Sequence, residues 1–353
     1  MTDLSHAGST AGLSQVAKPL TIAAMIATYR RPSDLMCCLD ALERQTRPLD
    51  DVIVVHRDTD TATAAALDAR PGGVLPLRVC VVSEPGVVAA RNLGLDNCAT
   101  DLLATLDDDT APHADWAARA VEHFQADPAL GGLGGRDCLY NGDIVVEPGK
   151  AVVGRVEWAG RIVADHHLGV GGPRPVDMLK GANMIFRARA FGAIRFDRRL
   201  RGKGAQPYED LKFTLDVRRQ GWKIIYDPTV QVDHFPGTSE QVRHYVQVAA
   251  VQDREGFDAL MYNEVLALWG EFSPARRLVF AGWSLLVGTR IAPGVVQAIR
   301  FTPRLGLASW QRFLMTQRAK FGAMRELSGG ATRQPPPQAG QHAPPGRDDA
   351  AWP

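Results

Sequence analysis

The sequence has 353 residues, 45% of them hydrophobic, which is enough for one large folded domain or two smaller ones. Lysines and arginines number 40 against 39 acidic residues, so the formal net charge is +1 and a general electrostatic grip on nucleic acid is not expected. The five cysteines are odd in number and form no C-x-x-C pair. They indicate neither a disulfide framework nor a cysteine zinc site, and they favour a reducing, cytoplasmic compartment.

The balanced total hides an uneven distribution of charge. From Phe272 to Arg325 there are nine basic residues and no acidic ones, which leaves a formal charge of −8 on the remainder of the chain. Aromatic residues lie among these arginines, a composition suited to the surface of an anionic membrane. The apolar run Leu278–Thr289 within it is too short to span a bilayer. The alternative is a pair of ordinary helices packed on the rest of the chain, with their arginines in solvent.

Short apolar runs alternate with helical patterns in the first third of the chain. Strands are expected over Leu20–Thr28, Asp51–Val55, Leu77–Val82 and Leu102–Leu106, and helices after Ser33 and over Thr61–Ala69 and Val87–Cys98. This order predicts an α/β fold in which helices flank a mostly parallel sheet. In such sheets ligands bind beyond the carboxyl ends of the strands.

The alternation stops near residue 130. The glycine-rich run Gly131–Gly135 and the segments after it predict short strands and long loops. Further along, the patterns predict a helix over Asp210–Gln220, strands over Trp222–Tyr226 and Val230–Val232, and a long helix over Gln241–Trp269. We therefore expect four parts: a disordered segment 1–18, an α/β domain 19–240, a basic helical extension 241–328, and a disordered, proline-rich tail 329–353.

Three adjacent aspartates, Asp107, Asp108 and Asp109, directly follow the fourth expected strand. Their carboxylates repel one another and are costly to desolvate, a conflict that a divalent cation removes. Hard oxygen ligands suit Mg²⁺ or Mn²⁺, and in an extended turn the first and third side chains point the same way. The alternative is a solvated acidic loop that caps a helix over Ala111–Ala120.

Glu209 and Asp210 stand at the start of an expected helix, beside the glycine-rich segment Arg201–Gly204. A carboxylate there can accept a proton from a bound hydroxyl, or it can simply stabilise the positive end of the helix dipole. His234 follows an expected strand and is a candidate metal ligand, with a purely structural histidine as the alternative.

Six motifs in order define a resemblance that runs from about Leu20 to His234. They are ATYRR (27–31), EPGVVAARN (84–92), LDDD (106–109), KGANMIFRARAF (180–191), YED (208–210) and GWKIIYDPTVQVDH (221–234). Together they resemble the family 2 glycosyltransferases of the GT-A fold, a Rossmann-like fold of nucleotide-diphospho-sugar transferases. The basic C-terminal segment lies outside the resemblance.

The resemblance implies roles for individual residues. Asp210 would be the catalytic base, supported by Glu209. Residues expected to bind the donor nucleotide or its diphosphate are Thr28, Arg30, Asp58, Arg91, Asp107 and Asp108. Gly181, Ala182 and Asn183 would border the donor sugar and the acceptor. Asp107, Asp109 and His234 would hold a divalent metal, Mn²⁺ or Mg²⁺.

Three departures from the family pattern bear on specificity. His56 and Arg57 occupy positions where an acidic V-D-D-G-S-type run is usual, so Asp58 is expected to replace the aspartate that reads the base. Arg30 replaces the asparagine of the P-T-Y-N-R pattern, which is compatible with a nearby diphosphate. The Q-x-x-R-W motif of processive members does not occur, which favours single additions over polymerisation.

The resemblance therefore implies a metal-dependent, inverting glycosyltransferase that moves a sugar from a nucleotide-sugar donor to a hydroxyl of a saccharide or lipid-linked acceptor. Polysaccharide or glycoconjugate biosynthesis is the expected setting. The expected location is the cytoplasm, peripheral to the inner face of the cell membrane if the basic segment binds lipid. The alternatives are a sugar-phosphate nucleotidyltransferase and an inactive scaffold that binds nucleotide sugars.

Overall fold

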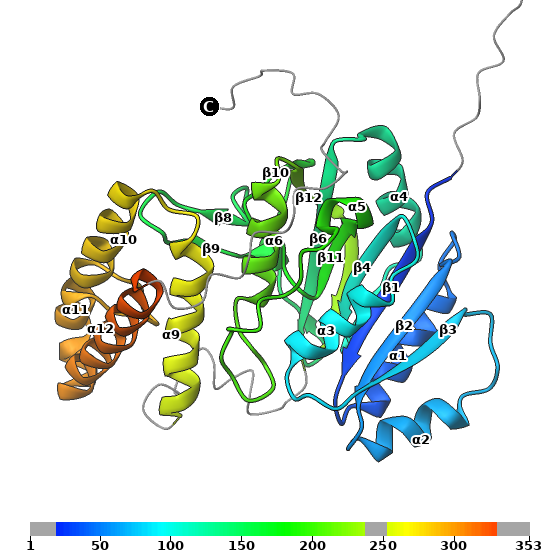
Figure 1. Ribbon diagram of the computed structural model, residues 1–353, viewed down its shortest axis with the longest axis horizontal. Coiled ribbons are helices and arrows are strands. Elements are labelled where there is room, and N and C mark those ends of the chain that lie inside the picture. The colour runs from blue at the N-terminus through cyan, green and yellow to red at the C-terminus, as the bar shows by residue number, and fades with distance from the viewer. Residues whose placement is uncertain (1–18, 237–252, 330–353) are drawn as a thin grey trace, which may run out of the picture.

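The computed structural model describes residues 19–236 and 253–329, and it has a twisted ten-stranded sheet at its centre (Figure 1). The strands are β1 (Ile22–Thr28), β2 (Asp51–Arg57), β3 (Leu77–Val82), β4 (Leu102–Asp107), β5 (Thr110–Pro112), β6 (Leu130–Asn141), β7 (Ile144–Val145), β10 (Arg174–Pro175), β11 (Asn183–Arg187) and β12 (Lys223–His234). A separate hairpin pairs β8 (Arg155–Val156) with β9 (Ile162–Val163).

Helices pack on both faces of this sheet. They are α1 (Pro32–Glu43), α2 (Thr61–Ala69), α3 (Val87–Asp96), α4 (Trp116–Ala126), α5 (Ala188–Phe191) and α6 (Glu209–Arg219), with a short 3₁₀ turn at His166–Leu168. Buried residues of α1 and α4 pack with one face of β1, and buried residues of α3 and α6 belong to the core on the other face. The α/β arrangement expected from the sequence is therefore confirmed.

The strand order places several of the sequence motifs at the carboxyl ends of neighbouring parallel strands. The main path runs β10-β12-β6-β11-β4-β1-β2-β3, with β1 parallel to both β2 and β4. The carboxyl ends of these three strands, at Thr28, Arg57 and Asp107, therefore lie beside one another. Parallel sheets bind their ligands at the carboxyl ends of the strands.

The middle of the chain departs from the predictions in two places, although the short strands expected after the glycine-rich run do occur as β7 to β10. The glycine-rich run does not break into short strands but lies within the 12-residue strand β6. Glycine is required there because β12 and β11 approach closely: a Cβ at Gly135 would lie 1.7 Å from the Val230 carbonyl oxygen. The two strands expected after Gly221 are one strand, β12, with a shift in register between Asp227 and Gln231.

The alternative prediction of a helix over Ala111–Ala120 is also wrong. Residues Thr110–Pro112 form β5, which pairs with β12, and α4 begins only at Trp116. The three aspartates therefore do not cap a helix. Asp108 and Asp109 are buried, 5% and 7% exposed, which also contradicts a solvated acidic loop.

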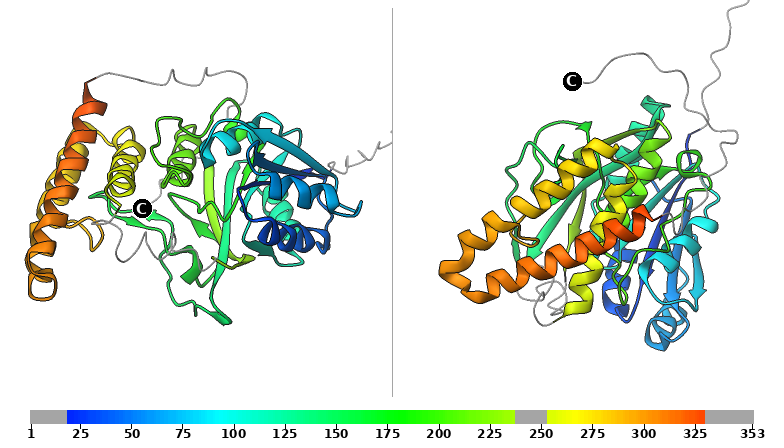
Figure 2. Two further views of the ribbon diagram at one scale, coloured as in Figure 1. Left: turned by 90° about the horizontal axis from the view of Figure 1, so that it is seen from below. Right: turned by 60° about the vertical axis from the view of Figure 1, so that its left-hand side comes forward.

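Four more helices form a layered group beside the sheet (Figure 2). They are α9 (Arg254–Trp269), α10 (Pro274–Leu286), α11 (Val295–Leu305) and α12 (Leu307–Ser328). α9 packs against α6, and α12 packs on α9 through a fully buried ion pair between Lys320 and Glu264. Of the helix expected over 241–269, residues 241–252 lie outside the described residues, as do 1–18 and 330–353. No described helix is both long and apolar enough to cross a bilayer.

Candidate active site

Arg91 of α3 links two of the sequence motifs at the carboxyl edge of the sheet. Its Nη2 atom donates a hydrogen bond of 2.9 Å to Oδ1 of Asp107, and its Nη1 atom donates to Glu209. The guanidinium is 3% exposed and lies over the ring of Phe196. Burial raises the pKa of Glu209 to about 8, although the charge of Arg91 opposes that shift. The aspartate motif and the E-D pair therefore form one site.

Asp210 sits in the first turn of α6, next to Glu209. One carboxylate oxygen, Oδ2, accepts the backbone N–H of Gly181 at 3.1 Å, and the other accepts the N–H of Leu211 at 2.7 Å. Burial raises the pKa of Asp210, and these two N–H donors oppose the shift. Tyr208, the residue before the helix, has φ of +67°, an unfavourable backbone conformation of the kind that occurs at functional sites.

Asp108 points back toward the end of β1. Its Oδ2 atom accepts the hydroxyl of Thr28 at 2.8 Å, and its Oδ1 atom accepts Nη1 of Arg31 at 3.1 Å. Burial raises the pKa of Asp108 to about 7, while Arg31 and the Thr28 hydroxyl lower it. The same Arg31 atom donates to Asp109 at 2.9 Å. Arg31 therefore bridges two of the three aspartates.

His234, at the end of β12, stands between two buried carboxylates. Its Nε2 atom lies 3.4 Å from Oδ1 of Asp109, and its Nδ1 atom lies 3.3 Å from Oδ2 of Asp137. Burial lowers the pKa of His234, but the two aspartates outweigh that effect and raise it to about 9. Asp137 also pairs with Lys180 and keeps a pKa well below its usual range despite its burial. Asp137 and Lys180 were both missed as site residues.

The side chains expected to hold a metal do come together. The ligand atoms of Asp107, Asp109 and His234 all lie within 4.8 Å of one another. Oδ1 of Asp109 is buried without a hydrogen-bond partner among the described residues, and the cationic His234 ring lies 3.4 Å from it. Two carboxylates and an imidazole can together ligate a divalent metal ion. His234 would have to release a proton to ligate.

The residues expected to border the donor sugar and acceptor differ in what they present. Gly181 lies against Arg91: a Cβ there would stand 2.8 Å from Nη2, so only glycine leaves the guanidinium in place. Ala182 is buried, 1% exposed. The Asn183 side chain forms hydrogen bonds with two other parts of the core. It accepts the Trp116 indole N–H at 3.0 Å and donates to the Val230 carbonyl at 2.9 Å. Its polar atoms are thus already engaged.

At the end of β2, Asp58 and Asp60 hold contrasting positions. Asp58 is exposed and pairs with Arg57 at 3.4 Å. Asp60 is 2% exposed, caps α2 by accepting the N–H of Thr63, and accepts the backbone N–H of Arg30. Arg30 has φ of +58° and an exposed side chain over the ring of Tyr29. Asp60 therefore fixes the loop after β1, a role that an acid three residues after the strand could have suggested.

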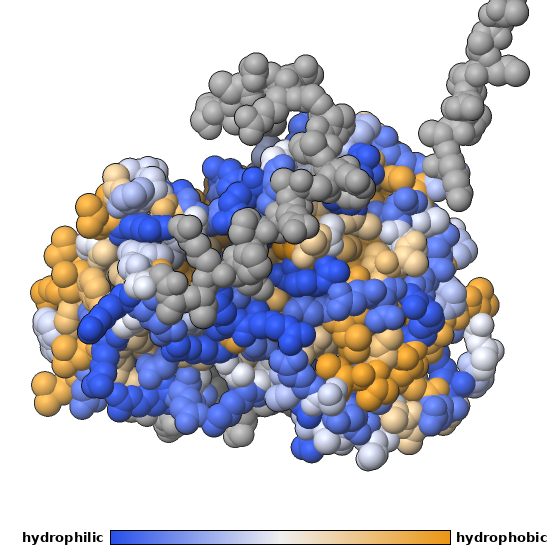
Figure 3. All heavy atoms as spheres, viewed as in Figure 1, coloured by the Kyte–Doolittle hydropathy of each residue, from blue (hydrophilic) through white to orange (hydrophobic). Residues whose placement is uncertain are grey.

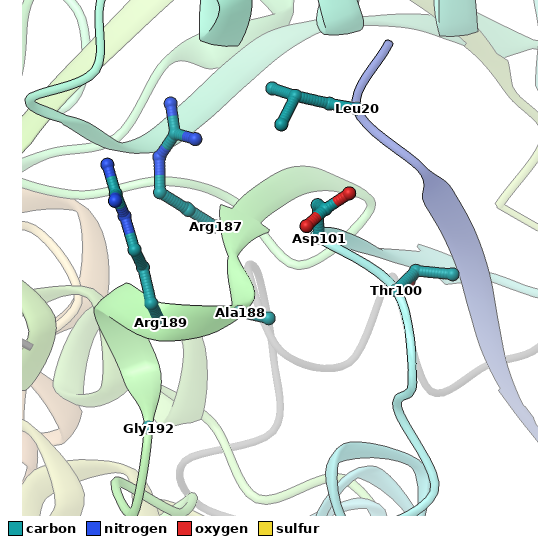
Figure 4. Close-up of a pocket in the computed structure, with 7 residues that line it drawn as sticks. All are labelled: Leu20, Thr100, Asp101, Arg187, Ala188, Arg189 and Gly192. Carbon is teal, nitrogen blue, oxygen red and sulfur yellow. The ribbon is translucent and has the colours of Figure 1, made fainter. Parts of the chain in front are cut away.

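A surface pocket at the opposite edge of the sheet does not belong to this site. Figure 4 shows it beside Leu20, Thr100 and Asp101, at the amino ends of β1 and β4. Arg187, which also lines it, uses its guanidinium to hold the carbonyls of Leu130 and Phe124. Its charge is thus committed to the fold.

Comparisons with known proteins bear on the amino-terminal part of the chain. Residues 24–153 match the model of glycosyl transferase family 2. The succinoglycan biosynthesis protein ExoM of Rhizobium meliloti is 33% identical over 114 residues, which cover 31% of this chain and 36% of that protein. Glycosyltransferase AglE of Haloferax volcanii is 29% identical over 103 residues, 28% of this chain and 34% of that protein. The matches thus span about a third of these relatives.

Solved structures resemble a larger part of the chain. TarS of S. aureus (residues 1–349, in complex with UDP-GlcNAc) has a TM-score of 0.57 at 14% identity and covers 86% of this chain and 81% of its own. GalNAc-T7 in complex with UDP, GalNAc and Mn²⁺ has a TM-score of 0.55 at 13% identity, covering 89% of this chain and 58% of its own. At such identities the likeness concerns the fold. Residues 24–153 are thus similar to glycosyl transferase family 2, and the chain has a fold that resembles the GT-A glycosyltransferases.

Proposed function

We propose that this chain is an inverting glycosyltransferase that moves a sugar from a nucleotide-sugar donor to a hydroxyl of a saccharide acceptor. The observation that carries the proposal is the contact of Arg91 with both Asp107 and Glu209. Arg91 bridges Asp107, which is expected near the diphosphate, and Glu209, which is next to the base expected near the acceptor. In a direct displacement the leaving diphosphate and the attacking hydroxyl must meet at the same anomeric carbon. Positioning the two substrates therefore contributes much of the rate acceleration.

In this mechanism Asp210 is the base that accepts the proton of the attacking hydroxyl. Its raised pKa suits that task, because a base works best when its pKa lies near the working pH. The two backbone N–H groups hold the carboxylate in one orientation. Glu209 fixes Arg91, whose guanidinium adds positive charge beside the leaving diphosphate. Thr28, Arg30, Asp58 and Asp108 complete the proposed nucleotide side, and Gly181, Ala182 and Asn183 the sugar side.

We propose that Asp107, Asp109 and His234 hold Mn²⁺ or Mg²⁺. Such a cation, when bound, supplies positive charge that stabilises the departing diphosphate. Asp137 would then hold the His234 ring at Nδ1, and Lys180 would balance the charge of Asp137. That arrangement, in which a buried carboxylate orients a ligating imidazole, is common around protein-bound metals.

The setting proposed is the synthesis of a polysaccharide or glycoconjugate in the cytoplasm, on a saccharide or lipid-linked acceptor. Its support is the similarity to proteins named for succinoglycan and amylovoran biosynthesis. The match to each covers less than half of that protein, so the acceptor is part of the proposal.

The test is to incubate the purified chain with Mn²⁺ and a panel of nucleotide sugars, with and without oligosaccharide acceptors, and to identify the nucleotide released. A nucleoside diphosphate is expected. Release of pyrophosphate from a nucleoside triphosphate and a sugar phosphate would instead indicate a nucleotidyltransferase. Nucleotide binding, seen as thermal stabilisation, without any release would indicate a scaffold.

A further inference from the structure

The outer surface of α10, α11 and α12 carries many exposed apolar side chains. We call this surface the outer helical face. Its exposed apolar residues are Leu278, Leu285, Leu286, Val296, Ile299, Leu305, Leu307, Leu314 and Phe321. In Figure 3 apolar residues gather along the left edge of the molecule, where these helices lie in Figure 1. An apolar stripe on a helix normally faces a core, so this one indicates a partner.

Arginines accompany this apolar surface at helical spacing. On α11, Arg300 and Arg304 follow Val296 at intervals of four residues, and on α12 Arg318 follows Leu314 in the same way. Residues four apart lie on the same side of a helix, so Arg300 and Arg318 each lie one turn from an exposed apolar side chain, and Arg304 lies one turn beyond Arg300. All three arginines are exposed, as are Arg290 and Arg325. None of these five has an acidic partner within residues 19–236 and 253–329.

Three other basic residues of this region serve the fold instead. Arg276 donates to the carbonyl of Trp158 at 3.0 Å, and Arg277 donates to the carbonyl of Trp269 at 2.8 Å. Lys320 is fully buried and paired with Glu264 at 2.8 Å. These contacts attach the inner side of the helices to the rest of the chain. The apolar rows and the unpaired arginines are left together on the outer side.

We propose that the outer helical face docks onto the surface of an anionic lipid bilayer. The apolar side chains would enter the interface, and the arginines would bind lipid phosphates. A second copy of the chain is a poorer partner, because it would bring two sets of unpaired arginines together. The docking itself does not rest on the proposed glycosyl transfer. Its use, which is to present the site to a lipid-linked acceptor, does.

The outer helical face is joined to the candidate active site through α9. Asn263 of α9 is fully buried, accepts the N–H of Arg201 at 2.8 Å, and donates to the carbonyls of Arg201 and Pro207. This loop leads directly into α6 and Glu209. On α12, Glu326 accepts the Tyr262 hydroxyl and pairs with Arg201. α12 therefore contacts the loop before α6 both directly, through Glu326, and through α9.

The test is flotation of the full chain with vesicles of neutral phosphatidylcholine and with vesicles that also contain phosphatidylglycerol. Binding is expected only to the anionic vesicles and should weaken as salt is added. The doubly substituted variant Arg300→Glu, Arg304→Glu should bind at least about tenfold more weakly, since each basic residue near anionic lipid contributes about fivefold. Val296→Ser with Ile299→Ser should weaken binding to a similar degree.

Matched controls are Arg119→Glu on α4 and the pair Val79→Ser, Val81→Ser on β3, whose valines are 46% and 56% exposed. These should float like the unmodified chain. Equal binding to neutral vesicles, no binding to anionic ones, or unchanged binding of the variants at the outer helical face would overturn the proposal. So would a dimer, measured by light scattering, that only the apolar substitutions dissociate.

Stabilisation by nucleotide, measured on the same samples, separates the two proposals. A variant that loses vesicle binding but keeps its nucleotide response supports the docking surface. A chain that binds anionic vesicles but transfers no sugar counts against the proposed function and leaves the docking surface supported.

Discussion

The candidate active site and the outer helical face hold their charges in opposite ways. In the site, the carboxylates of Asp108, Asp109 and Asp137 are buried, and each is paired with a cation from another part of the chain, Arg31 or Lys180. On the outer helical face, arginines stand in solvent without acidic partners. The near-neutral composition of the whole chain conceals both.

The difference concerns what each region requires from its surroundings. A buried charge is costly unless it is paired, so the acidic site constrains several elements at once and fixes its own geometry. An exposed arginine costs little and constrains nothing nearby, so its position is explained better by a partner outside the chain. Substitutions in the first region should therefore alter chemistry and folding, and those in the second mainly association.

The largest effect should come from removing the proposed base. Asp210→Asn is expected to reduce sugar transfer by about 10²–10⁴-fold, because the amide cannot accept the proton. Nucleotide binding should persist, since the amide oxygen can still accept one of the two backbone N–H bonds. Rates of nucleoside diphosphate release measure the loss, with Asp143→Asn in the exposed turn after β6 as the control. Equal rates for the two variants would remove Asp210 from the mechanism.

Charge burial also occurs where the two regions join, at Lys320 and Glu264. Lys320→Met should lower the free energy of unfolding by about 3–5 kcal/mol, because it leaves Glu264 buried without its partner. Adding Glu264→Met should restore most of the loss, since apolar replacements of both members of a pair are often neutral. Urea unfolding checks both variants. A double variant no more stable than the single one would mean that the unpaired charge is not the cause.

A third prediction concerns His166, which is fully buried in the 3₁₀ turn after β9. Burial lowers its pKa from 6.5 to about 4, so the folded protein binds fewer protons than the unfolded chain between those values. Stability is therefore fully present above pH 6.5 and falls as the pH drops toward about 4, by up to about 3 kcal/mol. Urea unfolding at several pH values measures the slope. His166→Gln should flatten it, whereas an unchanged slope would assign the effect to other groups.

The smallest of these effects should follow from crowding Arg91. In Gly181→Ala the new Cβ would displace the guanidinium that joins Asp107 to Glu209. Transfer should slow by about tenfold to 100-fold, because small displacements in an active site are costly. Gly172→Ala is the matched control, since its Cβ would meet nothing within 4 Å. Should both alanine variants retain full activity, the contact of Arg91 with the two carboxylates would not matter for the rate.

Much of the amino-terminal half could be predicted because its signals are local. Apolar runs of strand length alternate with helical patterns there, and each pattern lies within one element. The same is true of the aspartates after β4 and of the E-D pair at the start of α6, which the structure places on either side of Arg91. The division at residue 240 and the assigned roles of the site residues stay predictions.

The errors and omissions fall where contacts join distant parts of the chain. Glycine has a low propensity for strands, so the sequence does not predict the run in β6 as part of a long strand. The neighbouring strands β11 and β12 approach β6 so closely that side chains would not fit at these positions. Nothing near Asp137 in the sequence links it to Lys180 or His234, which lie 43 and 97 residues further along.

The sequence by itself determined the order of strands and helices, the position of the acidic motifs at the ends of elements, and the surplus of arginine near the C-terminus. Only the tertiary structure decided which charge meets which, and which arginines remain free. The reason is physical: periodicity and capping act over a few residues, whereas the pairing of buried charges depends on strands that meet only after the chain has folded.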